Sequence, residues 1–146
     1  MAEQNSNGSP RFTAPEAKVL IVDDVPTNVR VVKEVMSPCG VKVYVSLSGA
    51  KAVEMVQKGR YDLVFMDQMM PEMDGMEAVR RIRALGGGDD YFSKLPIVLL
   101  TANEATETEE TLDRQGINGW ITKPVNPVEI FGLLEKLLPA EKIIRP

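Results

Sequence analysis

Short apolar runs alternate along the chain with longer stretches in which apolar residues recur at helical spacing. The alternation occurs five times between residues 18 and 138, which is typical of βα units that build a parallel sheet. Several runs are continuously apolar, as expected for strands covered by helices on both faces. The pattern predicts five strands: Lys18–Asp23, Val41–Ser46, Leu63–Asp67, Ile97–Thr101 and Gly119–Thr122.

The segments between these strands carry signals for helix starts. Asp74 and Asn126 each precede a glutamate by three positions, a capping-box arrangement, and Ser48 is expected to cap a helix that runs through Gln57. A helix over residues 103–115 has few apolar residues, so we expect it to be the least stable element. The triple glycine at 86–88 predicts a flexible insertion before the fourth strand.

The length of 146 residues, 44% of them hydrophobic, is enough for one domain with a substantial core. Residues 1–16 are rich in Asn, Gln, Ser, Gly and Pro and resemble neither a signal peptide nor a membrane span, so we expect a flexible leader. The domain itself is expected over residues 17–139. Residues 140–146 form a tail in which Ile143 and Ile144 have no obvious burial.

Charge and residue content exclude several classes of function. The net charge of -4 argues against nucleic acid or an anionic membrane as the direct partner, because both favour clustered Lys and Arg. Cys39 is the single cysteine, so the chain can build neither a disulfide nor a thiolate zinc site, and a reducing compartment such as the cytoplasm is expected. The chain contains no histidine and so carries no phosphohistidine, which means that any phosphate it receives must come from elsewhere.

Polar residues stand where the predicted strands end. Because the carboxyl ends of parallel strands meet at one edge of a sheet, we expect these side chains to converge. Crowded carboxylates repel one another, and a Mg²⁺ ion, which prefers oxygen ligands, would relieve the repulsion. Taken alone, Asp23 and Asp24 are equally consistent with a simpler interpretation, in which one caps a helix and the other is a solvated neighbour. The converging residues are Asp23, Asp24, Asp67, Thr101 and Lys123.

The run from Asp67 to Gly75, DQMMPEMDG, resembles the phosphoacceptor loop of response-regulator receiver domains of two-component signalling. Asp23-Asp24 is similar to the acidic pair of that family, and Lys123-Pro124 to its lysine followed by a cis-proline. The resemblance covers Lys18 to about Leu138. It implies an α/β, flavodoxin-like fold with a five-stranded parallel sheet of order 2-1-3-4-5 and helices on both faces.

The resemblance also implies chemistry. Asp67 accepts a phosphoryl group from a phosphohistidine donor in a Mg²⁺-dependent reaction. Asp24, Asp67 and the backbone carbonyl of Met69 bind the metal directly, and Asp23 acts through a metal-bound water. Lys123 donates to a phosphoryl oxygen after transfer and to Asp67 before it.

The resemblance further implies that phosphorylation produces the output signal through a conformational change. The Thr101 hydroxyl is drawn toward the phosphoryl group, and Trp120 occupies a position where the family usually carries Tyr or Phe that turns inward. Trp120 either takes part in this switch, or it only fills space in the core or packs at the surface. The implied partners are a sensor histidine kinase or a histidine phosphotransfer protein, and a downstream protein that reads the face formed by residues 103–138.

Two other functions fit part of this pattern. A phosphatase of the haloacid dehalogenase family also uses an aspartyl phosphate and Mg²⁺. That family requires an Asp-x-Asp motif after its first strand, and this chain has Asp23-Asp24-Val25 there instead. A receiver-like module used only for protein contact would not need the full set of site residues. The segment from Asp24 to Asn28 resembles receivers of hybrid histidine kinases, which favours a domain of such a kinase over a stand-alone regulator without deciding between them.

Overall fold

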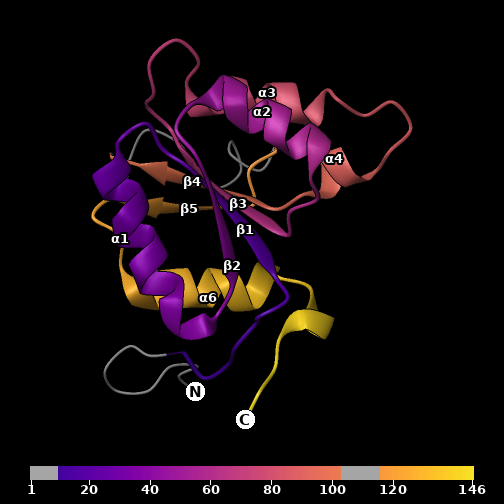
Figure 1. The fold of residues 1–146 in the computed structure, drawn as a ribbon. Helices are drawn as coiled ribbons and strands as arrows, with labels where there is room; N and C mark the ends of the chain where they lie inside the picture. Colours follow the sequence, from indigo (N-terminus) through magenta and orange to yellow (C-terminus); the bar gives the residue numbers. More distant parts are fainter. Residues whose placement is uncertain (1–9, 103–115) are drawn as a thin grey trace.

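The computed structural model describes residues 10–102 and 116–146, and it contains a five-stranded parallel sheet (Figure 1). The strand order is β2-β1-β3-β4-β5, which confirms the predicted flavodoxin-like topology. The observed bounds differ from the predicted ones by one residue in two strands. The strands are β1 (Lys18–Val22), β2 (Lys42–Ser46), β3 (Leu63–Asp67), β4 (Ile97–Thr101) and β5 (Gly119–Thr122).

The central strands are buried along their whole length. Every residue of β3 and β4 is buried, as are four of the five residues of β1. Their apolar side chains leave both faces of the sheet, so helices must cover both faces to exclude water. The continuous apolar runs in the sequence therefore identified the interior strands correctly.

Helices cover the sheet in two layers (Figure 1). On one face lie α1 (Pro26–Met36) and α6 (Pro127–Leu137), whose apolar residues share one core cluster. On the other face lie α2 (Gly49–Lys58), α3 (Gly75–Arg83) and the short α4 (Tyr91–Lys94), which share a second cluster. The short 3₁₀ helices Ser37–Cys39 and Ala140–Lys142 follow α1 and α6.

The predicted caps are present. Ser48 accepts a hydrogen bond from the amide of Lys51 at 3.1 Å, and Asp74 accepts one from the amide of Glu77 at 2.9 Å. Asn126 likewise accepts from the amide of Val128 at 2.8 Å. The reciprocal half of the capping box is not formed at α3, because the Glu77 carboxylate pairs with Arg80 and Arg81 instead.

The segment after the triple glycine is more ordered than the sequence predicted. Asp89 forms an ion pair with Arg60, whose guanidinium lies over the ring of Tyr91 at 4.4 Å from its centroid. The Tyr91 hydroxyl accepts a hydrogen bond from the amide of Tyr61 at 2.7 Å. These contacts tie α4 to the loop before β3, so the part of the insertion after Gly88 packs on the domain, while the flexibility expected of the triple glycine stays a prediction. The predicted helix at 103–115 lies outside the described residues.

Part of the expected leader packs on the domain. Phe12 and Ala14 are buried and belong to the same core cluster as α1 and α6. Thr13 pairs with Ile144 of the tail in an antiparallel bridge, with N···O distances of 2.9 and 2.7 Å. The apolar residues at positions 12 and 14 alternate with exposed residues, as in a half-buried strand. This differs from the expectation of a leader through residue 16, since residues 10–16 are held by the core.

The tail is held as well. Ile143 packs against the first core cluster, whereas the Ile144 side chain remains 54% exposed. Lys142 donates to the Asp62 carboxylate at 2.9 Å, and Arg145 pairs with Glu135 of α6 at 2.6 Å. Both ends of the described chain therefore meet below α1 and α6 (Figure 1).

Among residues 10–102 and 116–146, no helix has both the length and the apolar character needed to cross a bilayer.

Candidate functional site

The functional candidates converge at the carboxyl edge of the sheet. Asp67 and Thr101 are the last residues of β3 and β4, and Asp23 and Lys123 directly follow β1 and β5. Since all five strands run in the same direction, these four positions lie at one edge. The convergence expected from the sequence is therefore present.

One lysine connects two of the acids. Lys123 Nζ lies 2.7 Å from Asp67 Oδ1 and 3.4 Å from Asp23 Oδ2. Asp23, Asp24 and Asp67 each place a carboxylate oxygen within 4.8 Å of the others. Asp23 and Asp67 are buried and Asp24 is half-buried, so the acids and the lysine form one compact, partly solvent-shielded cluster.

The cluster has more negative than positive charge. Burial raises the pKa of Asp67, and although the Lys123 hydrogen bond opposes this, the charges of Asp23 and Asp24 add to the rise. Burial alone would lower the pKa of Lys123, but the hydrogen bond and charge of Asp67 outweigh it and the net shift is upward. Among the residues that the structure describes at this cluster, the Lys123 ammonium alone therefore leaves the three carboxylates incompletely neutralised.

The two leading acids differ in how they are engaged. Asp23 Oδ1 accepts a hydrogen bond from the amide of Val25 at 2.9 Å, and its other oxygen faces Lys123. Both oxygens of Asp23 thus have a donor already. Asp24, beside it, contributes the half-buried carboxylate of the group.

The loop from β3 to α3 frames the site on one side. The amide of Gly75 donates to the carbonyl of Gln68 at 2.8 Å, which holds the start of α3 against the end of β3. Glu72 has a positive φ of 68°, and the amide of Met73 bonds to the carbonyl of Pro71 across it in a γ-turn. Met69, which lies within this loop, is 71% exposed.

The two residues assigned to the switch lie in different surroundings. Thr101 is buried at the end of β4, and its carbonyl accepts from the amide of Lys123 at 2.8 Å. Trp120 pairs in register with Leu99 and packs, half-buried, against the cluster of the α2 and α3 face. The Lys123-Pro124 peptide bond is cis, as the resemblance implied.

A small apolar cavity beside the acids was missed by the sequence analysis. It has a volume of about 140 Å³ and lies between α1 and the segment that follows β5. Asn28 and Val31 of α1 line it from one side, and Lys123, Pro124 and Val125 from the other. The helical period of α1 marked Val31 as apolar, but nothing in the sequence placed this helix face next to Lys123.

A family model, the response regulator receiver domain, matches residues 19–135. The chain belongs to this family. The receiver is 37% identical over 127 residues to the sensor protein GacS of Pseudomonas syringae pv. syringae, a match that spans 87% of the chain and 14% of GacS. It is also 36% identical over 121 residues to hybrid signal transduction histidine kinase B of Dictyostelium discoideum, covering 78% of the chain and 6% of that kinase. The receiver thus spans only a small part of the kinases that it matches.

Solved receiver structures share its fold. The receiver domain of sensor histidine kinase PA1611 from Pseudomonas aeruginosa PAO1, crystallised with a magnesium ion in its active-site cleft, has a TM-score of 0.72 and 30% identity, covering 83% of this chain and 96% of that one. The receiver domain of the Saccharomyces cerevisiae response regulator Ssk1, in complex with the histidine phosphotransfer protein Ypd1, has a TM-score of 0.77 and 25% identity, covering 89% of this chain and 94% of that one. The receiver is thus established as a two-component signalling domain.

Proposed function

We propose that this receiver accepts a phosphoryl group on Asp67 in a Mg²⁺-dependent reaction and signals through the resulting change of conformation. The observation that carries the proposal is the 2.7 Å hydrogen bond from Lys123 to Asp67 within a cluster of three carboxylates. A lysine that holds a buried carboxylate at an open edge of the sheet leaves the second carboxylate oxygen to attack an incoming group. The strand-end positions alone would not select Asp67 from the other acids.

The donor set fits Mg²⁺. Three carboxylates within 4.8 Å and one ammonium leave excess negative charge, and hard oxygen ligands suit this ion. Asp24 and Asp67 would hold the ion directly together with the Met69 carbonyl, and Asp23 would act through a water because its oxygens already face Val25 and Lys123. When bound, Mg²⁺ supplies positive charge that reduces the repulsion between Asp67 and a phosphoryl group.

Each protein group has a distinct part in the transfer. An oxygen of Asp67 forms a bond to phosphorus as the bond from phosphorus to the donor imidazole nitrogen breaks, and the electron pair returns to that nitrogen. Lys123 then donates to a phosphoryl oxygen in place of Asp67, so its charge follows the developing negative charge. The Thr101 hydroxyl, at the end of the neighbouring strand, is the second donor for the product.

The phosphohistidine donor lies outside this chain's 146 residues, because the chain contains no histidine. Its similarity to histidine kinases, and the solved complex of Ssk1 with Ypd1, support a sensor kinase or a phosphotransfer protein as that donor. We propose that the reaction takes place in the cytoplasm, since the lone Cys39 is consistent with a reducing compartment. The output partner would read residues 116–138 together with the segment 103–115.

Conformational output requires that Thr101 moves toward the phosphoryl group and that β5 responds. Trp120, half-buried beside Leu99, is the large side chain on β5 that such a movement would disturb. Its indole is the sole tryptophan fluorophore of the chain. Its emission therefore offers a direct readout of the switch.

Mass spectrometry of the intact protein tests the proposal. The protein is incubated with acetyl phosphate with and without Mg²⁺, beside Asp67→Asn and the matched control Asp90→Asn, which changes an exposed aspartate on α4's N-terminal side. We expect one phosphoryl adduct that requires Mg²⁺, is lost in Asp67→Asn and persists in Asp90→Asn. An equal adduct in Asp67→Asn, or labelling without Mg²⁺, would refute the assignment. Sustained release of phosphate from small phosphate esters would instead support the phosphatase alternative.

A further inference from the structure

A second cavity lies at the opposite edge of the sheet, where the two ends of the described chain meet. It has a volume of about 340 Å³, within the range of small-molecule sites. The N-terminal segment precedes β1 and Pro38 precedes β2, so the cavity is at the amino edge of the strands, away from Asp67. It is lined by Pro10, Arg11, Phe12, Thr13, Pro38, Ile144, Arg145 and Pro146.

The walls of this cavity are fixed and mostly apolar. Phe12 is 3% exposed in the core cluster, and the bridge between Thr13 and Ile144 uses both backbone groups of each residue. Three prolines, whose φ angles are restricted, complete the lining. A cavity with such walls is formed before a ligand arrives, so binding costs little ordering of the protein.

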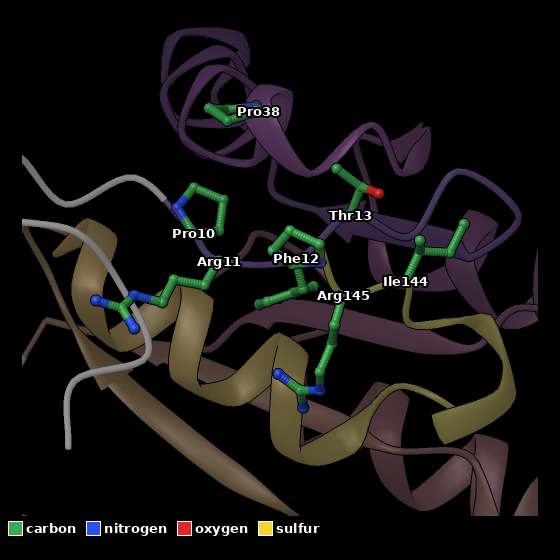
Figure 2. A pocket seen from close by; sticks show the side chains of 8 residues that line it. Pro10, Arg11, Phe12, Thr13, Pro38, Ile144 and Arg145 are labelled. Atoms are coloured by element: carbon green, nitrogen blue, oxygen red, sulfur yellow. The ribbon is translucent and has the colours of Figure 1, made fainter.

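Its charge comes from two arginines, shown as sticks in Figure 2. Arg145 is paired with Glu135 at 2.6 Å, so its charge is already compensated. Arg11 is exposed, and among the residues that the structure describes it has no ion-pair or hydrogen-bond partner. The cavity therefore carries about one uncompensated positive charge at its rim.

We propose that this cavity binds a small organic monocarboxylate with an aromatic or branched apolar body. The apolar part lies against Pro38 and Ile144, and the carboxylate accepts charge-assisted hydrogen bonds from the Arg11 guanidinium. One positive charge can neutralise a monocarboxylate, whereas it would leave a dianion with one uncompensated negative charge. This binding is independent of phosphorylation at Asp67, because the two sites lie at opposite edges of the sheet.

Titration followed by amide NMR tests the proposal, with 1-naphthaleneacetate as the probe and its neutral amide, 1-naphthaleneacetamide, as the control ligand. At typical ligand efficiency we expect a dissociation constant on the order of 1 mM for the acid. We expect the amide to bind about three- to fivefold more weakly, the range of one partly exposed charge pair. Shifts should concentrate at residues 10–14, 38 and 143–146.

Two variants make the result decisive. Arg11→Gln should weaken binding of the acid about three- to fivefold and leave binding of the neutral amide unchanged. The charge-matched Arg81→Gln on the distant α3 should change the affinity for neither ligand. Ile144→Ser, which keeps the backbone bridge, should weaken both ligands. Shifts spread evenly over the surface, no saturation by 10 mM (roughly ten times the expected constant), or equal acid binding by Arg11→Gln would overturn the proposal. For each variant without ligand, a backbone-amide NMR spectrum that matches the wild-type spectrum away from the substitution verifies that the protein is folded.

Discussion

Replacement of Gly75 by alanine tests how tightly the start of α3 is held against the phosphoacceptor strand. A Cβ at this position would lie 3.0 Å from the carbonyl carbon of Asp67 and from Cα of Gln68, and closer still to the Asp67 oxygen. Ordinary contacts between carbon atoms are about 3.5–4.0 Å. Both backbone atoms must therefore withdraw by roughly 0.5 Å or more. The atoms in the way are backbone, so a side-chain rotation cannot relieve the clash.

The expected cost follows from this geometry. Forced overpacking typically lowers the free energy of unfolding by about 1–3 kcal/mol, and a backbone clash belongs in the upper half of that range. For a domain of this size, a loss of about 2 kcal/mol corresponds to a fall in Tm of roughly 6–8 °C. Because the displaced carbonyl belongs to Asp67, the yield of Mg²⁺-dependent phosphorylation should fall as well.

Gly132 provides the matched control. It lies on the exposed side of α6, and a Cβ there meets no atom within 4 Å. Gly132→Ala should therefore raise the free energy of unfolding by about 0.5–1 kcal/mol, through helix propensity alone. Thermal unfolding followed by circular dichroism measures both variants. If Gly75→Ala melted at or above the wild-type temperature, the steric argument would be wrong.

Three further predictions concern positions other than the three clustered acids. Phe12→Ala should lower the free energy of unfolding by about 3 kcal/mol, measured by urea titration, because it empties a buried site next to α6; a loss below about 0.5 kcal/mol would mean that the N-terminal segment is not packed in solution. Glu72→Gly should raise Tm slightly, since its φ of 68° strains a residue with a Cβ, and a fall in Tm would contradict that strain. Burial raises the pKa of Cys39 to about 11, above its ordinary 9.0, so the folded state favours the protonated thiol. The stability that this group contributes is complete below pH 9 and is lost as pH rises toward 11. Iodoacetamide at pH 8 should therefore label Cys39 only after urea is added. Rapid labelling of the native protein would refute the burial of Cys39.

The sequence by itself determined the fold class and the identity of the candidate site residues. Continuous apolar runs of strand length and helical stripes between them are local signals, and parallel strands bring their carboxyl ends together whatever the details of packing. That rule was enough to place Asp67, Thr101 and Lys123 at one edge. Helix caps such as Ser48 and Asp74 were also readable, because a cap and its target are only a few positions apart.

Only the tertiary structure decided which distant side chains touch. The hydrogen bond from Lys123 to Asp67 joins positions 56 residues apart, and the bridge between Thr13 and Ile144 joins the two ends of the domain. The sequence analysis also missed how Arg60 holds α4, because no local pattern marks a contact between separate loops. Short-range spacing specifies elements, whereas contacts between them depend on the shapes and charges that the whole packed core brings together.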